Sequence, residues 1–83
     1  MSIDQNFIKM VKGRLALALK KLDGWRDFEV YMTDDEVQLW RDVVTLCNRI
    51  VIADRAEADQ LEVMQLTERM YTTTDAAIAA GRI

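Results

Sequence analysis

The chain has 83 residues, of which 51% are hydrophobic and 30% charged, and its formal net charge is −3. This length predicts a single domain with one small core, and so high an apolar fraction leaves surplus apolar surface that favours self-association. The sequence has no histidine, one cysteine and no glycine-rich phosphate loop, which excludes the usual general bases, soft metal ligands and nucleotide-binding loops. We therefore expect a protein without cofactor or metal, and not an enzyme.

No segment holds the roughly eighteen uncharged apolar residues of a membrane span, and lysines interrupt the apolar positions near the N-terminus, unlike in a signal peptide. The lone cysteine, Cys47, lies on an apolar stripe, as expected of a buried thiol in a reducing compartment. These features predict a cytoplasmic protein that has no membrane partner.

Residues 1–24 are expected to form a basic amphipathic helix. Its apolar stripe recurs at helical spacing and consists of Phe7, Val11, Leu15, Ala18 and Leu22. Five cations lie opposite or beside this stripe: Lys9, Lys12, Arg14, Lys20 and Lys21. Residues 1–26 carry six basic and two acidic side chains, a net charge of +4, whereas residues 27–83 carry five arginines and twelve acids, a net charge of −7. The five cations form either a surface that contacts phosphate groups, repeated in a ring of copies, or an ordinary solvated helix face.

Residues 25–32 are expected to connect this helix to a second one. The run Phe28-Glu29-Val30-Tyr31 alternates as a strand does, but four residues equally suit an extended connector, so we expect an all-α fold. Trp25 and Phe28 follow the basic run rather than interleave with it, which argues against a surface that stacks single-stranded nucleic-acid bases.

A second helix is expected to begin after Thr33, because Thr33 and Glu36 have the spacing of a capping box. From Leu39 onward its apolar side chains form one broad face, which indicates contact with two neighbours. This face consists of Leu39, Trp40, Val43, Leu46, Cys47, Ile50 and Val51. Trp40 is expected to be a structural residue that anchors the helical hairpin of residues 33–83 against the first helix.

The turn of this hairpin is expected at Ala53-Asp54. Ile52 falls on the polar face of the second helix, which indicates a change of direction, and Asp54 and Glu57 repeat the capping spacing. A third helix is therefore expected from about residue 55 to about residue 80. Because neither proline nor glycine marks the turn, residues 34–80 alternatively form one long helix.

Three places in the third helix stand out. Asp59 falls on its inner stripe and is expected either to have a hydrogen-bond partner or to lie at the wet start of the helix, and a catalytic carboxylate is a further alternative. The segment Thr72-Thr73-Thr74-Asp75 is the place where the helix is most prone to break or bend. Gly81 is expected to form a left-handed C-terminal cap.

Four apolar residues lie away from the predicted core stripes. Met10 and Leu17 belong to the first helix, and Leu61 and Met64 project from the far side of the last helix. Singly scattered hydrophobic residues are normal on monomers, but pairs on two helices of a short chain favour a subunit interface. In a closed ring, the two pairs would be different patches that meet head to tail.

The sequence of residues 33–83 resembles the central segment of phage small terminase subunits of the HK97-like type. The shared features are a tryptophan-bearing helix, an acidic start to a long helix, an aromatic residue near its middle, an alanine-rich stretch and a closing glycine. In this sequence they are Trp40, Glu57-Ala58-Asp59, Leu61-Glu62, Tyr71, Ala76-Ala77-Ile78 and Gly81-Arg82-Ile83. The chain departs from the family in having Ile50-Val51-Ile52-Ala53 where a glycine-containing loop is usual, and family members generally continue well past the closing glycine.

The resemblance implies a DNA-packaging protein that forms a ring of identical subunits, recognises viral DNA and regulates the large terminase subunit, which carries the ATPase and the nuclease. The basic first helix would then be the DNA-binding candidate, with weak binding, and Tyr71 and Gly81 would be structural. Such a protein would act in the cytoplasm of the infected host.

Two other functions remain open. A small acidic helical adaptor or inhibitor that binds a host or viral protein would have a similarly compact sequence, and its negative hairpin would steer the encounter. A small all-helical enzyme of the chorismate mutase type would need cations around an anionic substrate. Its candidates are Arg14, Lys21, Arg41 and Arg49.

Overall fold

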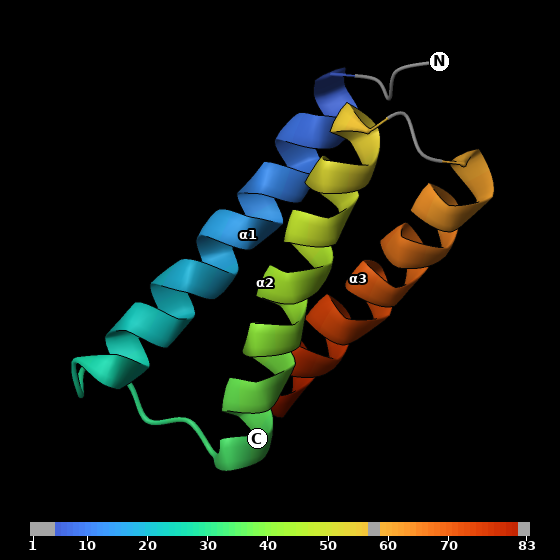
Figure 1. The fold of residues 1–83 in the computed structure, drawn as a ribbon. Coiled ribbons are helices and arrows are strands. Elements are labelled where there is room, and N and C mark those ends of the chain that lie inside the picture. The colour runs from blue at the N-terminus through green and yellow to red at the C-terminus, as the bar shows by residue number, and fades with distance from the viewer. Residues whose placement is uncertain (1–4, 57–58, 82–83) are drawn as a thin grey trace.

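The computed structural model describes residues 5–56 and 59–81, and these residues form three α-helices (Figure 1). Helix α1 spans Gln5–Arg26, α2 spans Asp34–Arg55 and α3 spans Gln60–Ala80. No strand occurs in the described ranges, so the expected all-α fold of a first helix packed on a helical hairpin is confirmed. None of the described helices is long and apolar enough to cross a membrane.

Helix α2 is the central element of the fold. It packs against α1 on one side and α3 on the other, and each neighbour runs antiparallel to it (Figure 1). The broad apolar face of α2 therefore touches two neighbours, as its sequence predicts. The resulting bundle is elongated, with principal extents of 42 × 19 × 17 Å.

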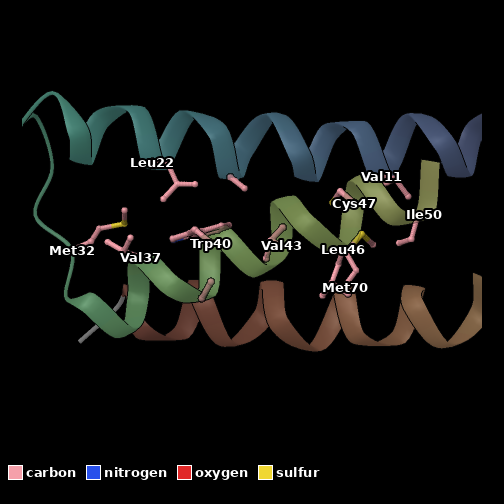
Figure 2. Packing of buried hydrophobic residues seen from close by; sticks show 12 residues of the cluster. Val11, Leu22, Met32, Val37, Trp40, Val43, Leu46, Cys47, Ile50 and Met70 are labelled. Atoms are coloured by element: carbon pink, nitrogen blue, oxygen red, sulfur yellow. The ribbon is translucent and has the colours of Figure 1, made fainter. Parts of the chain in front are cut away.

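The core follows the buried face of α2 along its whole length (Figure 2). Its fully buried side chains include Val11 of α1, Trp40 and Ile50 of α2, and Met70 of α3. Trp40 is only 1% exposed and points toward α1 near Leu22 (Figure 2), so it packs between α2 and the first helix. Its indole N–H is buried and has no hydrogen-bond partner among the described residues.

Helix α1 ends in a Schellman motif whose left-handed residue is Phe28. The Phe28 N–H donates to the Trp25 carbonyl at 3.2 Å and the Glu29 N–H donates to the Gly24 carbonyl at 2.8 Å, which are the two bonds that define this motif. Phe28 has φ of 61°, the one positive φ among the described non-glycine residues. Glycine is favoured here because an L side chain in this region costs about 1–2 kcal/mol. The connector after α1 therefore holds a strained phenylalanine.

The cap of α2 forms as expected. The Thr33 hydroxyl accepts a hydrogen bond from the Glu36 N–H at 3.2 Å. Three acidic residues occupy the first turn, where their negative charges interact favourably with the positive end of the helix dipole.

The predicted turn at Ala53-Asp54 is wrong, because α2 continues through Ile52 to Arg55. Asp54 lies inside α2 instead of capping a new helix, and its predicted partner, Glu57, lies outside the described residues. One isoleucine on a polar face costs a continuing helix little, since a single exposed hydrophobic residue is tolerated. The alternative of one long helix over residues 34–80 is also wrong, because α2 and α3 are separate antiparallel helices.

Helix α3 begins five residues later than expected, and Asp59 is its N-cap. The Asp59 carboxylate accepts a hydrogen bond from the Leu61 N–H at 3.1 Å and is exposed. This agrees with a residue that has a hydrogen-bond partner at the wet start of the helix.

Helix α3 continues without a break through its threonine-rich segment. The Thr74 hydroxyl is fully buried and donates to the Met70 carbonyl at 2.6 Å, so its polar group is satisfied within the helix. The predicted left-handed cap at Gly81 is also wrong, since Gly81 has φ of −76°. A Cβ at Gly81 would lie 3.0 Å from Glu36 Oε2, so glycine suits the close approach of the end of α3 to the start of α2.

Candidate functional site

The lysines of α1 form a group of like charges on the described surface. Lys9, Lys12, Lys20 and Lys21 are all exposed, and none of them forms an ion pair with a described residue. Lys9 and Lys20 lie opposite the buried stripe and are about 16 Å apart along the axis, while Lys12 and Lys21 lie on its two flanks. The four ammonium groups, here called the lysine face, therefore cover about half of the circumference of α1.

The acids near this face do little to neutralise it. Asp23 is the one acidic residue in α1, and its carboxylate lies 3.5 Å from the Arg26 guanidinium. Both side chains of this pair are largely exposed, so the pair contributes little to stability. The lysine face thus keeps its charge available for an anionic partner.

Arg14 differs from the four lysines. Its guanidinium lies 4.6 Å from the centre of the Tyr71 ring, and its Nε is buried without a hydrogen-bond partner. Tyr71 in turn donates a hydrogen bond from its hydroxyl to the Met10 sulfur at 3.2 Å. Tyr71 therefore ties α3 to two residues of α1, and Arg14 is used within the fold.

The four apolar residues predicted for a subunit interface have two different surroundings. Met10 and Leu17, on the side of α1 that meets Tyr71, are 38% and 37% exposed. Leu61 and Met64, at the start of α3, are 59% and 58% exposed. The pair on α3 is thus the more accessible of the two.

The connector between α1 and α2 carries the most exposed aromatic side chains of the described chain. Phe28 is 97% exposed and Tyr31 90% exposed, and Val30 between them is 43% exposed. The backbone that presents them is well anchored, because the Val30 N–H donates to the Gly24 carbonyl at 3.2 Å and Met32 is buried. We call residues 27–33 the aromatic loop.

Sequence reasoning treated the aromatic loop as a plain connector and missed this surface. Two aromatic residues within four positions, set among acidic neighbours, were the available signal. It could not show exposure, because a connector between two helices can as easily fold its aromatics over the end of the core.

Ile52 is a further exposed apolar residue and is 64% exposed on the outer face of α2. Arg49 and Arg55 lie one helical turn before and after it and are exposed. Arg41 lies nearer the start of α2, and its guanidinium is 5.7 Å from the centre of the Trp25 ring.

A hollow of about 350 Å³ is lined by residues of α3 alone: Glu62, Gln65, Leu66, Glu68 and Arg69. The cations considered for an anionic substrate, Arg14, Lys21, Arg41 and Arg49, do not line it. No group of three metal-binding side chains occurs among the residues that the structure describes.

Cys47 is inaccessible at the centre of the core. Burial raises the pKa of its thiol to about 11, against a smaller opposing effect of the positive charge on Arg14. A buried thiol of this kind is a poor nucleophile, because the reactive form is the thiolate.

Comparison of the chain with models of protein families, with curated proteins and with solved structures finds no match.

Proposed function

We propose that this chain is a non-catalytic DNA-packaging protein of the small terminase type, which assembles into a ring, binds viral DNA and regulates a large terminase motor. The observation that carries the proposal is the lysine face of α1, in which four exposed ammonium groups have no ion-pair partner among the described residues. The resemblance of residues 33–83 to that family supplies the biological setting, which is the cytoplasm of an infected host.

Self-assembly is part of this proposal because one copy alone would bind DNA weakly. The net charge of the chain is −3, and four lysines can neutralise at most a few phosphates. In a ring of identical subunits the same face recurs in every copy, and the contacts reinforce one another. The acidic remainder of the chain would then face neighbouring subunits or the motor.

The test is the salt dependence of binding to duplex DNA, measured by fluorescence anisotropy. The slope of log K against log salt concentration is negative, and each lost lysine–phosphate contact reduces its magnitude by about 0.9. The double variant Lys12→Gln/Lys20→Gln should therefore reduce this magnitude by about 2 for every subunit that touches DNA. The matched control is Arg41→Gln/Arg69→Gln, which removes the same charge from exposed positions of α2 and α3 and should change the slope far less.

Equal slopes for the two double variants would refute a specific role of the lysine face. Native mass spectrometry of the wild type, at the concentrations used for binding, reports the copy number in the same samples. A monomer that does not bind DNA under any salt condition would refute the proposal as a whole.

A second candidate function is an adaptor or inhibitor that binds a host or viral protein. The aromatic loop favours it, because exposed aromatic side chains are typical anchors of protein interfaces. A wild-type chain that stays monomeric, yet loses a protein partner when Tyr31 is changed to serine, would favour this candidate over DNA packaging.

A further inference from the structure

The side chain of Phe28 does not stabilise the monomer, so stability does not explain why a phenylalanine occurs at this position. Its backbone occupies the left-handed region at φ of 61°, where glycine is favoured, and its ring is 97% exposed. Strained backbone conformations persist where the surroundings impose them and often mark functional positions. The Schellman motif imposes the backbone here, but nothing in the fold requires an aromatic side chain.

The charges around the aromatic loop limit what it can bind. Asp27, Glu29, Asp34 and Asp35 lie within the loop or in the first turn of α2, and all are exposed. This negative surface repels phosphate groups, so the loop does not add to a DNA-binding surface. It fits an apolar surface that is flanked by cations.

The chain itself carries such a surface around Ile52. Arg49 and Arg55 precede and follow Ile52 by three residues, which places both guanidinium groups beside its side chain on the outer face of α2. Asp54 is half-buried and projects from the opposite side of the helix. Arginine also stacks well on aromatic rings, so this surface complements the aromatic loop in both charge and chemistry.

The two surfaces cannot meet within one chain. The aromatic loop precedes the start of α2, and Ile52 lies about 27 Å along the helix from Asp34. The loop and the C-terminal end of α2 are at opposite ends of the bundle (Figure 1). A contact between them therefore joins two copies of the chain.

We propose that the aromatic loop of one copy docks on the Ile52 surface of the next, with Phe28 and Tyr31 against Ile52 and the acids of the loop beside Arg49 and Arg55. The contact is heterologous, because two different patches meet, and its repetition gives a ring or a filament. For its biological role the inference rests on the proposed function, since it supplies the subunit contact of the ring.

The size of the contact predicts reversible association. Two aromatic side chains bury about 300–500 Å², about half of the roughly 800 Å² that each partner contributes to a standard interface. One such contact is weak, but in a closed assembly every copy makes two contacts, one through its aromatic loop and one through its Ile52 surface. The assembly should therefore dissociate on dilution and in high salt.

The first test is Phe28→Gly, followed by sedimentation velocity and thermal unfolding. This change removes the ring and relieves the backbone, so the melting temperature should stay the same or rise while the apparent dissociation constant of self-association rises at least tenfold. The matched control is Leu19→Gln, which removes another exposed hydrophobic residue, 45% exposed on α1, and should leave association unchanged. If Phe28→Gly associates like the wild type, or if Leu19→Gln weakens association as much as Phe28→Gly does, the proposal is overturned.

The second test uses charge reversal. Asp27→Lys/Glu29→Lys and Arg49→Glu/Arg55→Glu should each abolish self-association, because one end of every contact becomes repulsive. In an equimolar mixture, the reversed loop of the first variant complements the reversed surface of the second, and the unchanged loop of the second complements the unchanged surface of the first. The mixture should therefore restore assembly at low salt, with the two variants alternating. Two variants that fold but remain monomeric in the mixture would overturn the proposed contact.

Failure of this inference and failure of the proposed function give different results. If the wild type assembles, and Phe28→Gly does not, but neither binds duplex DNA, the contact stands and the DNA-packaging function fails. If Phe28→Gly still assembles and binds DNA with the wild-type salt slope, the function stands and the contact fails.

Discussion

Alkaline pH should destabilise the fold through one side chain, Cys47. Burial raises the pKa of this thiol from its ordinary value of 9.0 to about 11, although the charge of Arg14 opposes the rise. The folded chain thus holds the thiol proton more tightly than the unfolded chain does. The stability linked to Cys47 is fully present below pH 9.0 and is lost as the pH rises from 9.0 toward about 11, because the unfolded chain ionises first. One pKa unit corresponds to about 1.4 kcal/mol, so the free energy of unfolding should fall by about 1 kcal/mol between pH 8 and pH 10.

The assay is urea unfolding at pH 8 and pH 10, followed by circular dichroism, for the wild type and for Cys47→Ala. The variant loses packing and is less stable at both pH values, but its loss between them should be smaller than that of the wild type by about 1 kcal/mol. Every other side chain is the same in both proteins, so the difference isolates the thiol. An identical loss of stability in the two proteins would show that the thiol is not shielded from ionisation in the fold, and the reasoning would be wrong.

Three further substitutions test the local structure by thermal unfolding. Gly13→Ala should stabilise the chain by about 0.5–1 kcal/mol, because a Cβ at Gly13 would meet nothing within 4 Å and alanine favours the helix; an unchanged or lower melting temperature would contradict this. Thr33→Ala should cost about 1 kcal/mol, since the Glu36 N–H loses its capping acceptor, and a cost of zero would show that water replaces the cap. Tyr71→Phe removes the hydroxyl that donates to Met10 but keeps the ring under the guanidinium of α1, so it should cost less than about 1 kcal/mol. Tyr71→Leu should cost clearly more, and equal costs for both changes would mean that the ring contact contributes nothing.

The sequence predicted α2 well because its signals are local. The cap at Thr33 depends on residues three positions apart, and the broad apolar face follows from helical periodicity alone. The lysine face is predictable for the same reason, since exposure opposite a buried stripe needs no knowledge of the neighbours. The burial of Trp40 follows from its place on that face of α2.

The boundary between α2 and α3 could not be read in the same way. Asp54 and Asp59 are both acceptable N-caps in sequence, and only packing decides which one is used. In the fold, Ala53 is buried, so α2 gains burial by continuing past Ile52. Asp59 is then the first available cap for a helix that returns along α2.

The role of Arg14 was equally hidden from the sequence. It belongs to the same basic run as the lysines, and nothing local sets it apart. Its partner, Tyr71, lies on another helix and far along the chain, and the two meet only because α1 and α3 flank the same central helix. A contact of this kind becomes predictable only when the arrangement of the helices is known.

The exposed apolar residues fall into two groups, according to how much their replacement would reduce the stability of the monomer. Met10 receives a hydrogen bond from Tyr71, so its replacement disturbs the tie between α1 and α3. Phe28, Tyr31 and Ile52 are 97%, 90% and 64% exposed, and truncating them should cost the fold little. Phe28 is the sharpest case, because glycine would satisfy the backbone better and expose less apolar surface. The Phe28 side chain contributes little to the fold, and its backbone conformation favours glycine. A contact outside the monomer best explains why a phenylalanine occurs at this position. The opposite charges around Phe28 and Ile52 make a second copy of the chain the partner that fits best.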